Sequence, residues 1–106
     1  RGGVKIAPEE LDAVLSQMPD VLEGEVAAYP DEIMGERICA VIVPRPGKQP
    51  TLESVRAYFT AAGLALFKHP ERLQVVDQLP RNSVGKIVRG DLAKLAVTTA
   101  TPGRAG

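Results

Sequence analysis

Aromatic residues are scarce in this sequence, and tryptophan is absent. Aromatics make up 4% of the 106 residues, so a hydrophobic core must consist mainly of Val, Ile, Leu and Ala. The hydrophobic fraction of 44% and the charged fraction of 25% are nevertheless ordinary for a globular protein. Because the length fits one domain, we expect a small aliphatic core.

Net charge and long apolar runs are absent as well. Thirteen basic and thirteen acidic residues cancel, which disfavours nucleic-acid binding through a broad basic face. The longest wholly apolar run, Ile38 to Val43, is far shorter than the roughly 20 residues that a membrane-spanning helix needs. We therefore expect no transmembrane segment and a cytoplasmic location, either free or peripheral to a membrane.

Cysteine and histidine each occur once, as Cys39 and His69. A single cysteine excludes an intrachain disulfide, and its place in an apolar run predicts a buried, inert thiol. His69 has no cysteine or second histidine with which to form a zinc site. We therefore expect a structural role for His69 and no metal site.

The first clear element is a helix over residues 8–17. Pro8 suits the first turn of a helix, and the acidic residues Glu9, Glu10 and Asp12 favour a helix N-terminus. Apolar residues then recur at the spacing of one helical face. They are Leu11, Val14, Leu15 and Met18.

Further strands and helices follow along the chain. Residues 37–43 form the best strand candidate, ended by Pro44 and expected at the centre of a sheet. The other expected elements are a strand over residues 21–29 broken by Gly24, a helix capped by Thr51 and ended by Gly63, a strand over residues 73–77 and a helix over residues 88–97. The second helix is expected to bury Leu52, Val55, Phe59 and Ala62.

The order of these elements predicts the fold class. Residues 4–7 add a short extended segment before the first helix, and residues 98–106 lack periodicity. We expect an α+β domain, in which about three helices cover a small, largely antiparallel sheet of about three strands plus the short N-terminal extended segment.

Two segments of the chain carry a specific pattern. The first is Gly2-Gly3-Val4-Lys5-Ile6-Ala7-Pro8-Glu9-Glu10-Leu11, and the second is Leu79-Pro80-Arg81-Asn82-Ser83-Val84-Gly85-Lys86-Ile87-Val88-Arg89. Between them lie Tyr29-Pro30-Asp31, Gly35-Glu36 and Phe67-Lys68-His69-Pro70. Together and in this order, these segments resemble the C-terminal domain of the adenylate-forming superfamily, which includes acyl-CoA synthetases, peptide-synthetase adenylation domains and luciferases. The resemblance covers about residues 1–95.

The resemblance implies a mobile lid within a larger enzyme. A large N-terminal domain of such enzymes binds ATP, with Mg²⁺, and a carboxylic acid. In one orientation the lid brings a lysine into the active site for adenylation, and in a second orientation its Gly-rich segment lines the tunnel for the pantetheine of CoA. We expect residues 1–97 to form the lid, residues 98–106 to form a flexible tail, and the chain, which begins at Arg1 rather than Met, to be part of a longer protein.

Lys86 is the expected catalytic residue, and its chemistry fits this role independently. When a carboxylate attacks the α-phosphate of ATP, two anions meet, and a positive group between them stabilises the transition state. A lysine ammonium is a point charge on a long stem, which suits phosphate oxygens. Gly85 allows the backbone to turn tightly beside it. The alternative is an ordinary solvated surface lysine.

Further cofactor-binding candidates come from matching family positions. They are Gly2, Gly3, Lys5, Gly85, Arg89 and Lys68. By resemblance, the Gly pair approaches the pantetheine arm and Lys5 lies near the adenylate. Arg89, like Arg81, either fixes the loop or meets phosphate groups, and Lys68 either meets the CoA phosphates or is a surface charge.

We expect the chain to belong to an acid–CoA ligase for fatty or aryl acids, inactive as an isolated domain. The loop resembles acyl- and aryl-CoA synthetases more than peptide synthetases through Leu79-Pro80-Arg81 and Gly85-Lys86-Ile87. Its middle residues, Asn82-Ser83-Val84, depart from those usual in the family. One alternative is a ligase that loads a carrier protein, and another is a lid acting in trans. A ferredoxin-like RNA-binding module is a remote alternative, because residues 37–43 carry no aromatic side chain for base stacking.

Overall fold

The structure, a computed structural model, describes residues 8–31 and 35–98. Its elements, in chain order, are α1 (Pro8–Gln17), β1 (Val21–Asp31), β2 (Gly35–Pro44), α2 (Leu52–Ala61), the 3-10 turn η1 (Leu66–Lys68), β3 (Arg72–Val75) and α3 (Arg89–Thr98). The strands form one sheet in the order β1-β2-β3, in which β1 and β2 are antiparallel and β2 and β3 are parallel. The expected α+β class with a largely antiparallel sheet is confirmed. The extended segment over residues 4–7 and the tail from residue 99 onward lie outside the described residues.

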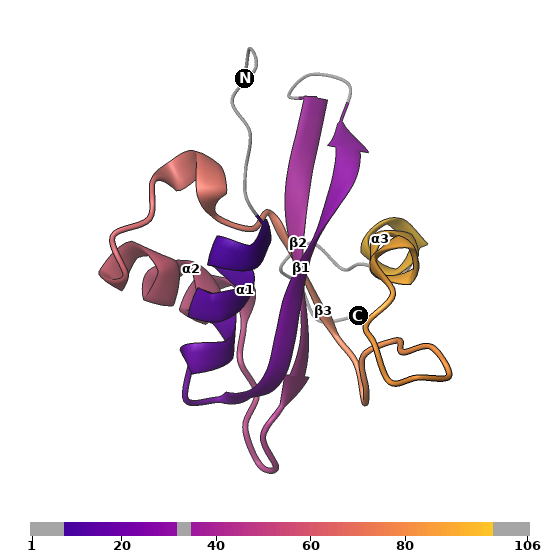
Figure 1. Cartoon of the computed structure of the whole chain (residues 1–106). Helices are drawn as coiled ribbons and strands as arrows, with labels where there is room; N and C mark the ends of the chain where they lie inside the picture. The colour runs from indigo at the N-terminus through magenta and orange to yellow at the C-terminus, as the bar shows by residue number, and fades with distance from the viewer. Residues whose placement is uncertain (1–7, 32–34, 99–106) are drawn as a thin grey trace.

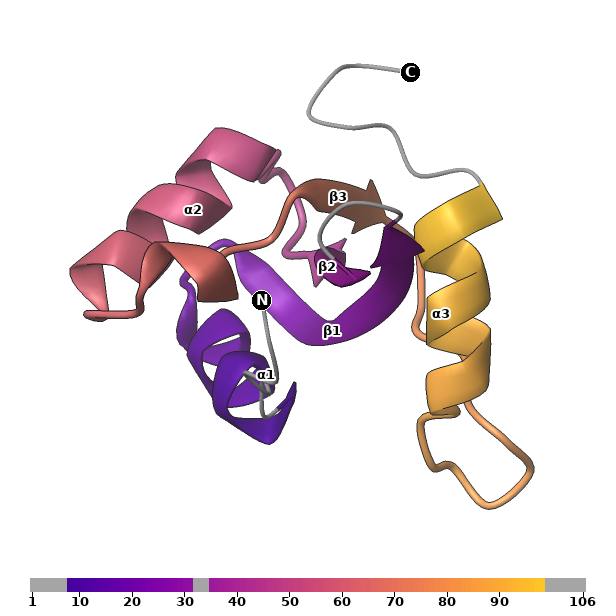
Figure 2. The same cartoon turned by 90° about the horizontal axis from the view of Figure 1, so that it is seen from above.

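Helices cover both faces of this sheet. Helices α1 and α2 pack on one face and α3 packs on the other (Figures 1 and 2). The described part of the sheet therefore has no open face on which nucleic-acid bases could stack, as an RNA-binding module of the ferredoxin-like type requires. This arrangement counts against the remote alternative function.

The central strand β2 explains the continuous apolar run in the sequence. Because successive side chains of a strand point to opposite faces, a strand covered on both sides must be apolar at every position. Side chains from Ile38 to Val43 are all buried. Ile38, Ala40 and Ile42 face α1 and α2, and Cys39, Val41 and Val43 face α3.

Helix α1 has the bounds that the sequence predicts, and α2 begins as predicted. Thr51 caps α2 through a reciprocal pair of hydrogen bonds with Ser54, a capping box. Val55 and Phe59 are fully buried. The predicted buried face is wrong at its two ends, because Leu52 is only half-buried and Ala62 is exposed where the chain leaves the helix.

Gly24 does not break β1, contrary to the sequence prediction. The strand continues through it to Asp31, and the register shift lies earlier, between Val21 and Glu23. Gly24 is instead a packing position, because an added Cβ would lie 2.7 Å from Cγ of the buried Leu15 in α1. The third strand also differs from its expected range, starting at Arg72 and ending at Val75.

We expect Gly24→Ala to lower the free energy of unfolding of the chain by about 1–3 kcal/mol, because the new methyl group overlaps a fully buried leucine. Urea denaturation followed by circular dichroism measures this. Gly90→Ala is the matched control, since an added Cβ at this position of α3 meets nothing within 4 Å and alanine favours the helix by up to about 1 kcal/mol. Equal effects of the two substitutions would contradict the packing role of Gly24.

The single cysteine and the single histidine both lie inside the domain. Burial raises the pKa of the Cys39 thiol to about 12, so the thiol stays protonated and unreactive at neutral pH. His69 is 3% exposed, its Nε2 hydrogen-bonds to the Leu64 carbonyl oxygen at 3.1 Å, and its ring meets the edge of Phe59. These contacts agree with the predicted structural role of His69.

Candidate active-site lysine loop

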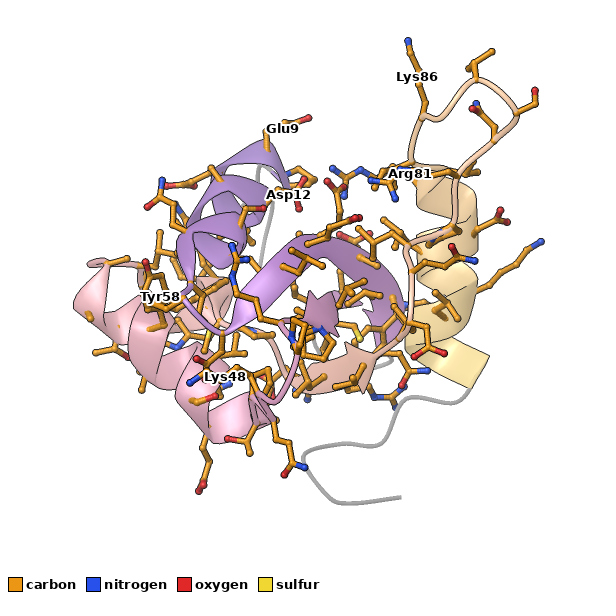
Figure 3. All side chains as sticks on the ribbon, turned by 90° about the horizontal axis from the view of Figure 1, so that it is seen from below. Glu9, Asp12, Lys48, Tyr58, Arg81 and Lys86 are labelled. Atoms are coloured by element: carbon orange, nitrogen blue, oxygen red, sulfur yellow. The ribbon has the colours of Figure 1, made fainter. Side chains whose placement is uncertain are left out.

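The loop between β3 and α3 extends beyond the body of the domain (Figures 1 and 2). Lys86 lies near its tip and its side chain points away from the sheet, whereas Asp12 and Arg81 lie closer to the domain body (Figure 3). Residues 81–86 are all exposed. Within residues 8–31 and 35–98, no carboxylate forms an ion pair with the Lys86 ammonium. The Lys86 ammonium is therefore exposed and has no carboxylate partner within the described part of the chain.

The loop is a narrow hairpin closed by backbone hydrogen bonds. Arg81 and Ile87 form an isolated β-bridge, and the N–H of Asn82 donates to the Lys86 carbonyl oxygen at 2.9 Å. The N–H of Gly85 donates to the Asn82 carbonyl oxygen at 2.9 Å, and Gly85 has φ +87°. This is the three-residue hairpin turn whose last position needs a left-handed residue. An added Cβ at Gly85 meets nothing within 4 Å, so the backbone angle rather than crowding within the domain requires glycine here.

The Asn82 side chain also belongs to the loop, and the sequence interpretation did not identify it. Its Oδ1 accepts from the backbone N–H groups of Val84 and Lys86, each at 3.0 Å. The signal in the sequence was the spacing, since asparagine at the first position and glycine at the fourth are preferred in a type I turn. Asn82 and Gly85 occupy these two positions.

Ion pairs tie both ends of the loop to strand β1. At one end, Arg81 Nη2 lies 2.9 Å from Glu23 Oε1, a charge contact without the alignment of a hydrogen bond. At the other end, Arg89 Nη1 donates to the Val26 carbonyl oxygen at 2.7 Å, and Nη2 pairs with Glu25 at 3.2 Å and with Asp12 of α1. An arginine at each end of the loop therefore attaches it to β1.

Asp12 completes this anchor on the outer edge of the sheet. Its Oδ1 accepts from the Val26 N–H at 2.8 Å while its other oxygen holds Arg89. The N–H and C=O groups of Val26 that point away from β2 are thus both satisfied by side chains, as an edge strand requires.

The anchor groups shift one another's pKa. Burial raises the pKa of Glu25, with the neighbouring Asp12 charge adding to the effect, while Arg89 and Arg81 oppose it. Burial alone would lower the pKa of Arg89, but the hydrogen bond and charge of Asp12 outweigh it, and the net pKa of Arg89 is raised. Arg89 therefore stays charged and engaged at the loop base. This arrangement favours the interpretation that Arg89 fixes the loop. A contact between Arg89 and a cofactor stays a prediction.

Lys68 lies on the opposite side of the sheet from the lysine loop. It belongs to η1 beside α2, whereas the loop leads into α3 (Figures 1 and 2). Its ammonium pairs with Glu10 at 3.0 Å and lies 6.0 Å from the centre of the Phe67 ring. The structure thus does not bring Lys68 and Lys86 together. Gly2, Gly3 and Lys5 lie outside the described residues, so their predicted contacts with pantetheine and adenylate stay predictions.

The described residues offer neither a metal cluster nor a bilayer span. No three His, Cys, Asp or Glu side chains in the described ranges converge as metal ligands would. None of the helices within those ranges has the length and apolarity needed to pass through a bilayer.

Comparison with known proteins identifies the domain. The AMP-binding enzyme C-terminal domain family matches residues 10–86. A salicylyl-CoA synthase / salicylate adenylyltransferase from a Streptomyces species is 49% identical over 82% of this chain and 16% of its own length. The oxalate–CoA ligase of Arabidopsis thaliana is 45% identical over 89% of this chain and 18% of its own length.

A solved structure shows the same fold over most of the chain. ATP-bound MatB from Rhodopseudomonas palustris superposes with a TM-score of 0.83 at 31% identity, over 92% of this chain and 19% of that protein. The chain thus spans less than a fifth of the length of these similar proteins. The matches confirm the resemblance carried by the two sequence segments, and the chain belongs to the AMP-binding enzyme C-terminal domain family.

Proposed function

We propose that this chain is the C-terminal mobile domain of an acid–CoA ligase, which activates a carboxylic acid with ATP and transfers the acyl group to CoA. The observation that carries the proposal is the Lys86 ammonium, exposed near the tip of a hydrogen-bonded turn and without a carboxylate partner among the described residues. Membership of the family supports it.

Lys86 acts in the first half-reaction. A carboxylate oxygen of the acid attacks the α-phosphorus of ATP, the bond from that phosphorus to the bridging oxygen of pyrophosphate breaks, and pyrophosphate leaves. Negative charge gathers on the phosphoryl oxygens as the two anions approach. The Lys86 ammonium stabilises this charge, and it acts most strongly in a site from which water is excluded.

Lys86 is not needed in the second half-reaction. The thiol of CoA, after losing its proton, attacks the carbonyl carbon of the acyl-adenylate, the bond to the AMP oxygen breaks, and AMP leaves. Rotation of the domain removes Lys86 and brings the segment with Gly2 and Gly3 to the pantetheine arm. One small domain thus serves two steps in two orientations.

The N-terminal domain of the same enzyme is the main partner. It holds ATP with Mg²⁺, the carboxylic acid and most of CoA, and this chain contributes Lys86, with Lys5 near the adenylate. Two findings support this division: the chain spans less than a fifth of its relatives, and MatB, which it resembles, was solved with ATP bound.

CoA is the acyl acceptor that we propose. The names of two relatives, salicylyl-CoA synthase / salicylate adenylyltransferase and oxalate–CoA ligase, both include CoA. The amino-acid sequence of the loop is also more similar to CoA ligases than to peptide synthetases. The second candidate is a ligase that adenylates an aryl acid and loads a carrier protein, favoured by the adenylyltransferase part of the first name.

We expect the full-length parent enzyme to catalyse acid-dependent exchange of pyrophosphate into ATP, and the isolated 106-residue chain to show none. The reason is that adenylation needs ATP and acid pockets together with Lys86, and this chain supplies only the lysine. The proposal would be overturned if the isolated chain catalysed the exchange. It would also be overturned if the parent enzyme catalysed no exchange with any acid in a panel of aliphatic and aryl acids.

The acceptor is tested in the same preparation. Acyl-adenylate is supplied to the parent enzyme together with either CoA or a carrier protein bearing phosphopantetheine, and thioester is measured by mass spectrometry. A kcat/KM at least about ten-fold higher with CoA supports the CoA ligase, a difference of about 1.4 kcal/mol in transition-state stabilisation. The reverse ratio would establish the carrier-loading ligase instead.

A further inference from the structure

Asn82 lies at the centre of the hydrogen bonds that shape the lysine loop. Its Oδ1 accepts from the N–H of Val84 and from the N–H of Lys86, each at 3.0 Å. Its own N–H donates to the Lys86 carbonyl oxygen at 2.9 Å, and its carbonyl oxygen accepts from Gly85 at 2.9 Å. Both backbone polar groups of Lys86 therefore bond to this one residue.

The side chain of Asn82, rather than its backbone carbonyl, accepts the hydrogen bond from the Lys86 N–H. In an ordinary hairpin pair, the N–H of Lys86 would bond to the Asn82 carbonyl oxygen. That oxygen instead accepts from Gly85, which closes the turn. The side-chain oxygen accepts from the Lys86 N–H in its place, so without this oxygen the Lys86 N–H loses the partner that it has within the loop.

Core packing does not hold this turn in place. Residues 81–86 are exposed, and Val84 near the tip is 75% exposed. Ion pairs from Arg81 and Arg89 fix only the two ends of the loop on β1. Between these ends, hydrogen bonds alone define the path of the backbone, and Asn82 makes the two that involve a side chain.

We infer that Asn82 is the positioning residue of Lys86: its side-chain oxygen fixes the backbone from which the catalytic ammonium reaches the phosphate. This inference rests on the proposed function, and it assigns Asn82 no contact with a substrate. Its physical basis is preorganisation. A long lysine side chain already loses rotamer freedom when it meets a phosphate, so a mobile backbone beneath it would add to the entropy cost of reaching the transition state.

The test uses the full-length parent enzyme and its two half-reactions. Asn82→Ala removes the acceptor oxygen, and we expect it to lower kcat of adenylation by about ten- to a hundred-fold, while thioester formation from supplied acyl-adenylate changes less than about two-fold. Asn82→Asp keeps an oxygen at the same position and should restore most of the adenylation rate, because it accepts the same two N–H bonds. Ser83→Ala, an exposed neighbour in the same turn, is the matched control and should leave both rates unchanged.

The same substitution made in the Lys86→Ala variant separates this inference from the proposed function. On Lys86→Ala, the Asn82→Ala change should have no further effect on adenylation, since nothing remains to be positioned. If Lys86→Ala lowers adenylation but Asn82→Ala does not, the inference is overturned and the proposed function stands. The inference also fails if Asn82→Ala lowers both half-reactions equally or if Asn82→Asp is as impaired as Asn82→Ala. If Lys86→Ala itself leaves adenylation intact, the proposed function fails.

Discussion

Replacing Lys86 with alanine in the full-length parent enzyme should lower acyl-adenylate formation by about a hundred- to a thousand-fold, the typical effect of removing one group that stabilises transition-state charge. Thioester formation from supplied acyl-adenylate should stay within about three-fold of the parent rate. We expect this difference because, in the proposed mechanism, Lys86 contacts the reacting phosphate only in the first orientation of the domain. Pyrophosphate exchange measures the first step, and mass spectrometry of the acyl-CoA measures the second.

Lys94→Ala is the matched control for this experiment. Lys94 lies on α3, close to the loop in sequence, and its side chain is 80% exposed with only a 3.8 Å contact to Asp91. The same change of charge there should leave both half-reactions within about two-fold, because a solvated surface charge is largely screened. An equal loss of both half-reactions in Lys86→Ala would contradict the two-orientation mechanism, and equal effects of Lys86→Ala and Lys94→Ala would contradict a catalytic role for Lys86.

The second large effect concerns the core. Phe59→Ala should lower the free energy of unfolding of the chain by about 3–5 kcal/mol, because it empties a fully buried aromatic site. Phe59 packs between α2 and the sheet, and its ring meets the edge of His69, so the cavity also loosens the segment that leads to β3. Since small domains are stable by only about 5–15 kcal/mol, this change threatens folding at 37 °C.

Phe67→Ala provides the comparison for the core prediction. It makes the same chemical change in η1, where the side chain is 43% exposed, and should cost less than about 1 kcal/mol. Urea denaturation of both variants gives the two free energies. A difference of less than about 1 kcal/mol between them would show that Phe59 is not the core residue that its burial indicates.

Local patterns in the sequence were sufficient where neighbouring residues control the structure. Helix α1 has the predicted bounds because Pro8, the acidic first turn and the apolar stripe all act within a few residues. Thr51 caps α2 through the backbone of Ser54, three positions away. Strand β2 was predicted because burial on both faces requires an unbroken apolar run.

Predictions failed where a partner distant in sequence decides the outcome. Gly24 looked like a strand breaker, yet it is the point where β1 approaches the buried Leu15. The predicted buried face of α2 was wrong at Leu52 and Ala62, because a periodic pattern does not reveal where a helix diverges from the sheet on which it packs. The sequence made no prediction for the pairing of β3, which lies parallel to β2 because α2 and η1 connect the two strands.

Some features of the candidate site also depend on local sequence, and others depend on residues distant in sequence. The glycine turn at Gly85 could be predicted from the sequence, because a left-handed turn favours glycine. The catalytic role of Lys86 was predicted because the proposed chemistry needs a mobile cation, and it stays a prediction. The role of Asn82 is also local, and turn statistics contained a signal for it. The anchor of Arg89 on Asp12 joins residues 77 positions apart, and no local pattern contains it.

The sequence by itself determined the starts of α1 and α2, the central strand, the glycine turn and the lysine that it carries, because each depends on backbone preferences and side-chain chemistry within a few residues. Only the tertiary structure decided which carboxylates hold the two ends of the loop, that Lys68 lies away from it, and that Gly24 packs against α1. These features depend on how the helices dock on the sheet. Docking is fixed by the summed packing of two apolar faces, to which residues throughout the chain contribute.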